Sequence, residues 1–289
     1  MNLRFQTAKF NLMTGCKTQK GRKEIKFKMK KKCIGIVRSA QELAVDVFDL
    51  WIETEIAKDA KPGQFVGVFT SKESTLLPRP ISICEVDKDK TAIRIVYRVV
   101  GKGTSEFSHY KAGRRVWLLG VLGNGYPLKE AEGKHALLLG GGIGIPPLVE
   151  LAKQLRNQEP TAKITVSVGY RSNDLFLTEE LSQYADVLVA TEDGSVGTQG
   201  NVMDAVKEHK ITPDIIYSCG PMPMLKAIKT YAEEKNIPAY ISLEERMACG
   251  VGACLGCVCK TTHKDHHSHV NNARICTDGP VFEAKEVEI

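Results

Sequence analysis

Four cysteines near the carboxyl end of the chain constrain its fold more than any other sequence feature. Cys249, Cys254 and Cys257 are separated by four and two residues, and Cys276 follows after 18 more. This spacing is typical of plant-type [2Fe–2S] clusters. Glycines between the cysteines permit the tight turns that a loop needs to wrap around an inorganic core. A structural zinc site is the alternative, but the unequal spacers favour the cluster.

The other cysteines and the histidines give weaker signals. The chain has nine cysteines, and this odd number argues against a secreted disulfide framework and for a reducing compartment, the cytoplasm. We expect Cys259 to be a packed thiol outside the ligand set. A histidine ligand, as in a Rieske site, is a further alternative, but four cysteines already complete the set. We therefore interpret as an exposed loop the histidines of the long spacer, which are His263, His266, His267 and His269.

The net charge of +6 is unevenly distributed. The first 32 residues hold eleven Lys or Arg and one acid, so the remainder carries an excess of four acids. Residues 1–29 are predicted to be a basic, disordered extension without function, and Met29 resembles a natural start. A transit peptide or a nucleic-acid role remains an alternative for this arm. The longest apolar segment contains Gly and Pro, so no membrane span is predicted.

The length of 289 residues predicts two or three domains. Residues 30–130 contain short runs rich in β-branched and aromatic residues, separated by turn signals, and no convincing helix. We therefore expect a small antiparallel β-barrel over this range. The strands are expected at 45–52, 64–69, 81–84, 92–97 and 115–119.

Residues 131–243 show a different pattern, in which apolar strands alternate with helical segments. Such alternation indicates βαβ units and a Rossmann-like parallel sheet. The first unit joins a strand at 136–139 to a helix that begins at Pro146-Pro147. Residues 244–289 are rich in Gly and Cys and are expected to form a third, small module around the cysteines.

Two turns in the α/β region are candidates for binding a dinucleotide. A strand, glycine turn and helix at 139–145 would bring backbone N–H groups and a helix dipole to phosphates, although close packing of strand and helix is the alternative. The candidates here are Gly141, Gly142 and Gly144. A second turn lies at a strand's carboxyl end, where ligands bind in such sheets. It consists of Cys219, Gly220, Pro221 and Met222.

Two segments of the expected barrel could bind a diphosphate. An arginine beside a proline-rigidified turn can pair bidentately with phosphate, and a Gly-x-Gly-Thr-Ser segment offers backbone N–H and hydroxyl donors. Each signal is weak alone. The first segment is Arg79, Pro80, Ile81 and Ser82; the second comprises Gly101, Gly103, Thr104 and Ser105, preceded by Tyr97 and Arg98.

Taken together, these motifs resemble the ferredoxin reductase superfamily. The cysteine tail from Ser242 to Phe282 is more specific, and is similar to the electron-transfer subunit of class B, NAD-dependent dihydroorotate dehydrogenase. The resemblance implies FAD in the barrel, NAD on the α/β domain and a [2Fe–2S] cluster in the tail. It also implies a heterotetramer with an FMN-containing catalytic subunit that oxidises dihydroorotate in pyrimidine synthesis.

The resemblance assigns roles to single residues. Arg79 and Thr104 are expected to hold the FAD diphosphate, with Ser82 near the flavin N5 edge. Cys219 is expected near the nicotinamide, and a buried inert thiol is its alternative. Glu244 and Glu245 could tune a cofactor, but a solvated pair is favoured.

Three questions stay open from the sequence. Arg171, after the second parallel strand, could meet the 2′-phosphate of NADP, whereas the resemblance favours NAD. Another reductase subunit of the superfamily, of ferredoxin or sulfhydrogenase type, would share the cofactor sites but feed a different partner. A nucleic-acid-binding protein with a zinc tail is the most distant alternative.

Overall fold

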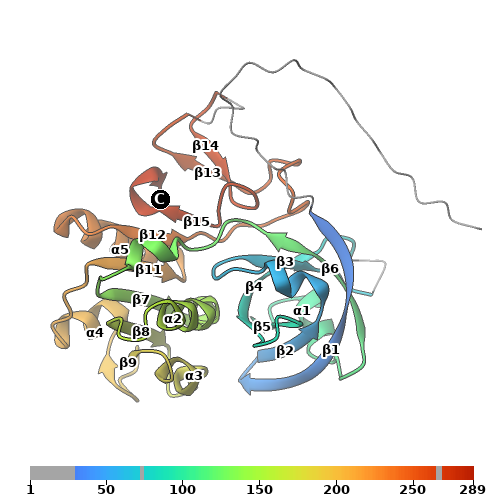
Figure 1. Ribbon diagram of the computed structural model, residues 1–289, viewed down its shortest axis with the longest axis horizontal. Coiled ribbons are helices and arrows are strands. Elements are labelled where there is room, and N and C mark those ends of the chain that lie inside the picture. Colours follow the sequence, from blue (N-terminus) through green and yellow to red (C-terminus); the bar gives the residue numbers. More distant parts are fainter. Residues whose placement is uncertain (1–29, 72–74, 265–268) are drawn as a thin grey trace, which may run out of the picture.

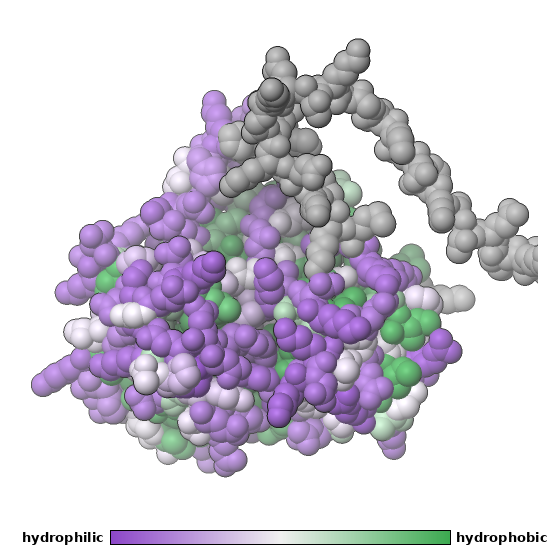
Figure 2. Space-filling view, viewed as in Figure 1, coloured by the Kyte–Doolittle hydropathy of each residue, from purple (hydrophilic) through white to green (hydrophobic). Residues whose placement is uncertain are grey.

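The computed structural model describes residues 30–71, 75–264 and 269–289. Figure 1 shows a β-barrel beside a sheet covered by helices, with a smaller module of C-terminal strands above both. The expected extension over residues 1–29 lies outside the described residues, as do His266 and His267 of the spacer. The face seen in Figure 2 is mostly hydrophilic, which agrees with apolar side chains being collected in the interior.

The expected barrel is confirmed as a closed antiparallel barrel with strand order β1-β2-β5-β4-β3-β6. Along β1, Cys33 and Val37 point into the core while Ile34 and Ile36 face outward, as the alternation of strand side chains requires. The strands are β1 (Lys31–Ala44), β2 (Val47–Glu53), β3 (Phe65–Val68), β4 (Arg79–Val86), β5 (Ala92–Arg98) and β6 (Arg115–Leu122).

The expectation that this region contains no helix is wrong. Helix α1 (Lys102–Phe107) follows β5, and short 3-10 turns occupy Glu55–Asp59 and Leu128–Ala131. The Thr104 hydroxyl accepts hydrogen bonds from the N–H groups of Val100 and Gly101, at 3.0 and 3.2 Å, and so caps the start of α1. Phe107 anchors the helix in the barrel core. Six residues, one of them a glycine, carry too little apolar periodicity to predict such a helix.

The α/β region forms a seven-stranded sheet of order β10-β9-β8-β7-β11-β12-β15, parallel except for β15. Residues of α2 and α3 pack on one face of the sheet and those of α4 and α5 on the other. The strands are β7 (Ala136–Gly141), β8 (Ile164–Tyr170), β9 (Asp186–Thr191), β10 (Thr198–Gln199), β11 (Ile215–Cys219) and β12 (Ala239–Ser242). The helices are α2 (Pro147–Gln158), α3 (Thr178–Ser182), α4 (Val202–Glu208) and α5 (Met222–Lys235).

The C-terminal residues are divided between two sheets. Strands β13 (Val258–Thr261), β14 (Asn272–Arg274) and β16 (Val287–Glu288) form a small sheet, whereas β15 (Val281–Glu283) pairs antiparallel with β12. Phe282 of β15 is buried in the apolar cluster that also contains Leu139 and Ile228 of the α/β region. The tail therefore shares a core with the larger sheet. No helix among the described residues is long and apolar enough to cross a membrane.

Truncating Phe282 should test this shared core. Because the ring is 7% exposed, Phe282→Ala is expected to lower the free energy of unfolding by about 3 kcal/mol. Val45→Ala, at a residue 67% exposed, is the control and should change it by less than about 0.5 kcal/mol. Chemical denaturation measures both, and equal stability of the two variants would contradict a shared core.

Candidate functional site

The loop from Cys249 to Cys257 folds around the first of its cysteines. The N–H groups of Val251 and Ala253 point at the Cys249 sulfur, at 3.4 and 3.3 Å. Gly250 and Gly252 have positive φ angles of 68° and 79°, which side chains with a Cβ rarely adopt. The glycines thus allow the backbone to turn its donors toward sulfur, which is the arrangement that iron–sulfur loops need.

The second loop, at Cys276, lies directly against the first. The N–H of Ile275 donates to the carbonyl of Cys257 at 2.8 Å. The Cys257 and Cys276 thiols lie close enough to affect each other's ionisation, and Cys249 and Cys254 form a second such pair. Among the described residues, no three His, Cys, Asp or Glu side chains are arranged closely enough to hold a metal ion. The four predicted ligands are therefore brought together as two adjacent pairs.

The electrostatics of the two pairs differ. Burial acts to raise the pKa of Cys249, but Val251, Cys254 and Ala253 together outweigh it and lower that pKa to about 7. Burial, followed by the neighbouring Cys257 thiol, raises the pKa of Cys276 to about 12. The buried thiols of Cys257 and Cys276 cannot both ionise without a nearby cation. This donor set therefore suits a cluster that contains iron ions. Cys254 is exposed at the surface of the loop.

Cys259 and the histidines of the spacer are predicted to lie outside the ligand set. Cys259 lies on β13, where burial raises its pKa to about 11, in keeping with a packed thiol. His263 and His269 are exposed.

The two barrel segments with expected phosphate contacts meet in the structure. Arg79, at the start of β4, lies across Gly103 of α1, where a Cβ atom would overlap the guanidinium. Thr104 is buried, and its hydroxyl donates to the carbonyl of Gly101 at 3.1 Å. The hydroxyl therefore shapes the turn. The first-turn N–H groups of α1 have no acceptor within the helix, which leaves them, with Arg79, as the donors for a diphosphate.

The other barrel candidates lie on β4, β5 and α1. Ser82 pairs with Phe65 across β4 and β3 and is half-buried, while Pro80 is exposed and Ile81 is buried. On β5, Arg98 is exposed and Tyr97 is 3% exposed. Its buried hydroxyl has no hydrogen-bond partner among the described residues. Ser105 lies in α1, one turn after Gly101, to whose carbonyl its N–H donates at 2.9 Å.

The two candidate dinucleotide turns touch one another at the carboxyl edge of the large sheet. A Cβ atom on Gly144 would overlap the carbonyl of Cys219, and one on Gly220 would meet Met224 and the backbone of Gly141. Close packing thus explains Gly144. Gly142 differs, because it has a φ of 52° and faces open space. Gly142 is the glycine at which a ligand can approach the backbone.

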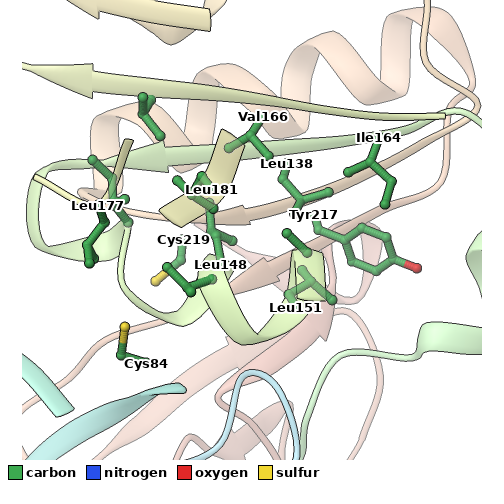
Figure 3. Packing of buried hydrophobic residues seen from close by; sticks show 14 of the residues in the cluster. Cys84, Leu138, Leu148, Leu151, Ile164, Val166, Leu177, Leu181, Tyr217 and Cys219 are labelled. Atoms are coloured by element: carbon green, nitrogen blue, oxygen red, sulfur yellow. The ribbon is translucent and has the colours of Figure 1, made fainter. Parts of the chain in front are cut away.

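Cys219 lies at the end of β11, at the boundary between the large sheet and the barrel. Figure 3 shows its sulfur in the same apolar cluster as Cys84 of β4. The residue is 1% exposed, and burial, with a smaller effect of Glu244, raises the pKa of its thiol well above the ordinary range. Cys219 is therefore a neutral thiol at neutral pH.

Sequence reasoning missed two residues beside Cys219. Tyr126, in the link between barrel and sheet, donates its hydroxyl to the carbonyl of Ser218 at 3.0 Å. Ser242, at the end of β12, is the register partner of Cys219 at the end of β11. No catalytic motif marks either residue, because Ser242 reaches the site through the pairing of β11 with β12 and Tyr126 through the link that follows the barrel. Glu244 and Glu245 are both exposed, although the surrounding protein raises the pKa of Glu244.

Two family models match the chain. Residues 244–288 match the iron–sulfur cluster binding domain of dihydroorotate dehydrogenase B, and residues 138–230 match the oxidoreductase NAD-binding domain.

Among solved structures, an NADH-dependent reduced ferredoxin-NADP oxidoreductase is similar over 89% of this chain and 90% of its own, with 31% identity and a TM-score of 0.76. A ferredoxin NADP+ reductase of Neisseria gonorrhoeae, with bound FAD and NADP, shares the fold at 14% identity and a TM-score of 0.58, over 70% of this chain and 91% of its own.

Curated relatives match nearly end to end. A protein of Geobacillus sp. (strain WCH70) is 41% identical over 263 residues, covering 90% of this chain and 99% of its own. One of Lysinibacillus sphaericus is 44% identical over 249 residues, covering 85% and 94%. Both are named as the electron transfer subunit of dihydroorotate dehydrogenase B (NAD(+)).

Replacing one cysteine should separate the cluster from the flavin. Cys254→Ser is expected to abolish the iron–sulfur absorbance and bound iron, because four thiolates are required. FAD content should stay unchanged, since the diphosphate candidates lie in the barrel. The matched control is Cys259→Ser, two residues beyond Cys257, which should keep the cluster. Iron analysis and a visible spectrum provide the readout; a cluster retained in Cys254→Ser, or lost in Cys259→Ser, would refute the ligand assignment.

Proposed function

The chain belongs to the family of dihydroorotate dehydrogenase B electron transfer subunits, and we propose that it passes electrons from an FMN-containing catalytic subunit to NAD+. The catalytic subunit oxidises dihydroorotate to orotate in pyrimidine synthesis. The observation that carries this proposal is the pair of cysteine loops packed against a flavin-reductase fold, with near end-to-end similarity to the curated relatives.

The fold serves a chain of three redox groups. An iron–sulfur cluster exchanges single electrons and NAD+ accepts a hydride, and the FAD between them handles both. Within this scheme, Cys249, Cys254, Cys257 and Cys276 are the cluster ligands. The N–H groups of Val251 and Ala253 stabilise negative charge on the Cys249 sulfur.

In the barrel, Arg79 and the first turn of α1 neutralise and orient the FAD diphosphate. Ser82, three residues along β4 from Arg79, would face the flavin once FAD is bound. At the large sheet, the open backbone at Gly142 receives the NAD pyrophosphate. Cys219 would present a neutral thiol to the nicotinamide. Because Cys219 is buried, water is excluded from its thiol.

The partner is expected to dock on the cysteine loop. The loop carries exposed apolar side chains, since Leu255 is 60% exposed and Val251 is 41% exposed. Apolar residues beside a redox centre suit a protein interface that shields the transfer path from water. The assembly we propose is a heterotetramer of two copies of each subunit. Eight free thiols among the described residues also support a reducing, cytoplasmic setting.

Mixing the purified chain with the FMN-containing catalytic subunit tests the proposal. The mixture should form NADH from dihydroorotate and NAD+, whereas neither subunit alone should do so. A chain that binds this partner but supports no NADH formation, or that does not bind it, would refute the proposed function.

A charge on the exposed cysteine loop should weaken binding of the catalytic subunit. Leu255→Glu is expected to reduce the affinity for the catalytic subunit about tenfold or more, because it places a carboxylate in an apolar interface. Its NADH-to-ferricyanide activity, which needs no partner, should remain. Val45→Glu introduces the same charge at a hairpin remote from the loop and should keep full affinity. Titration of NADH formation against catalytic subunit measures both variants, and equal affinities would argue against docking at this loop.

A further inference from the structure

Among the described residues, the end of strand β4 has a neighbouring strand on one side only. β3 pairs with β4 only over Arg79 to Ser82, and the N–H of Ile83 donates to the carbonyl of Gln64. Beyond this point β4 continues for three residues to Val86, paired with β5 alone. Backbone N–H and C=O groups in a protein interior need partners, so the edge of Val86 must be satisfied from elsewhere.

Helix α2 of the large sheet supplies these partners. The N–H of Val86 donates to Glu150 Oε2 at 2.9 Å, and Lys153 Nζ donates to the carbonyl of Val86 at 2.7 Å. Two side chains one helical turn apart therefore replace the missing strand. A helix of one domain completes the hydrogen bonding of the other domain's barrel.

The two α2 side chains are themselves held in place. Glu150 has a side chain only 2% exposed, and its second oxygen accepts a hydrogen bond from Gln154 at 2.6 Å. Lys153 Nζ also donates to Glu85 Oε1 at 2.9 Å, and lies 3.7 Å from Glu150. A buried carboxylate is tolerated only when paired, and its position is correspondingly well defined.

A second ionic contact lies further along the same interface. Arg94 of β5 is 6% exposed and donates to Asp49 at 2.8 and 3.0 Å. The same guanidinium reaches Glu180 of α3 at 3.3 Å and lies 3.6 Å from Glu85. Both helices on this face of the large sheet are thus attached to the outer wall of the barrel.

β4 and α2, which are joined in this way, carry the proposed flavin site and the proposed nicotinamide site. β4 begins with Arg79 and Ser82, the flavin candidates, and ends at Val86. α2 begins at Pro147, directly after the glycine turn with the open backbone at Gly142. The distance between the two sites is therefore set by rigid elements fastened at Val86.

We propose that Glu150 and Lys153 are positioning residues that fix the nicotinamide site against the flavin site and so set the hydride transfer rate. The inference rests on the proposed function. Reacting atoms must approach to about 3–3.5 Å, and a shift of about 1 Å costs up to about a hundredfold in rate. The cluster loops contact the barrel elsewhere, where Gly250 lies beside Leu119 and Leu122 of β6. The contact of α2 with Val86 therefore does not hold them.

The test uses the isolated subunit with FAD and cluster bound. Lys153→Met removes the donor to Val86, and Lys153→Arg restores one. The matched control is Lys207→Met on α4, which also removes a lysine paired with an acid three residues earlier, here Asp204, but away from the barrel. Stopped-flow absorbance measures the rate at which saturating NADH reduces FAD, and titration gives the NADH dissociation constant.

Lys153→Met is expected to reduce FAD about tenfold to a hundredfold more slowly, with FAD content, cluster spectrum and NADH affinity within about twofold of wild type. Lys153→Arg should recover most of the rate, and Lys207→Met should match wild type. A wild-type rate in Lys153→Met overturns the proposal, as does a slow rate explained by lost FAD or NADH binding. If Lys153→Met does not fold, Glu150→Gln decides by the same criteria. Failure of NADH to reduce the wild-type FAD would instead refute the proposed function.

Discussion

One junction, where the barrel ends and the tail returns, holds the cluster loops to the rest of the protein. The N–H of Asn124 donates to the carbonyl of Gly279 at 2.6 Å, and its side chain donates to the carbonyl of Asp278 at 2.8 Å. At the same place the N–H of Leu243 donates to the carbonyl of Pro280 at 2.8 Å. Hydrogen bonds thus join the barrel, the large sheet and the tail at one place, a few residues after Cys276.

This junction explains why the tail is not an independent module. Electron transfer demands short distances between successive carriers, and a freely moving cluster domain would lengthen them. β15 continues from the junction into the large sheet, and Phe282 fills its core. The side chains of α2 make a second attachment, to β4. β4 carries the residues that we propose for the flavin site, and α2 follows the glycine turn that we propose for the nicotinamide site.

The sequence predicted what local patterns encode. The runs of β-branched residues predicted strands β2 to β6 of the barrel but not β1, and the strand–glycine–helix order predicted the α/β region. The cysteine spacing predicted two loops that the structure brings side by side. These features succeed because strand and helix periods and turn glycines act within a few residues of chain.

What sequence reasoning missed depends on contacts between distant segments. α1 is too short to show a periodicity, and its start is fixed by the Thr104 hydroxyl. Glu150 and Lys153 resemble ordinary polar residues of a helix until β4 is known to extend beyond β3. Ser242 acquires its place beside Cys219 only through the pairing of β11 with β12, and Tyr126 only through the path of the link after the barrel.

The most direct measurement of the central claim is an anaerobic spectrum of the assembled complex of this chain with its catalytic subunit. Adding dihydroorotate without NAD+ should bleach the FAD and the cluster of this chain, and adding NAD+ should then restore both spectra. FAD and cluster absorbance that stay unchanged on addition of dihydroorotate, in a complex whose FMN is bleached, would contradict an electron path through this subunit.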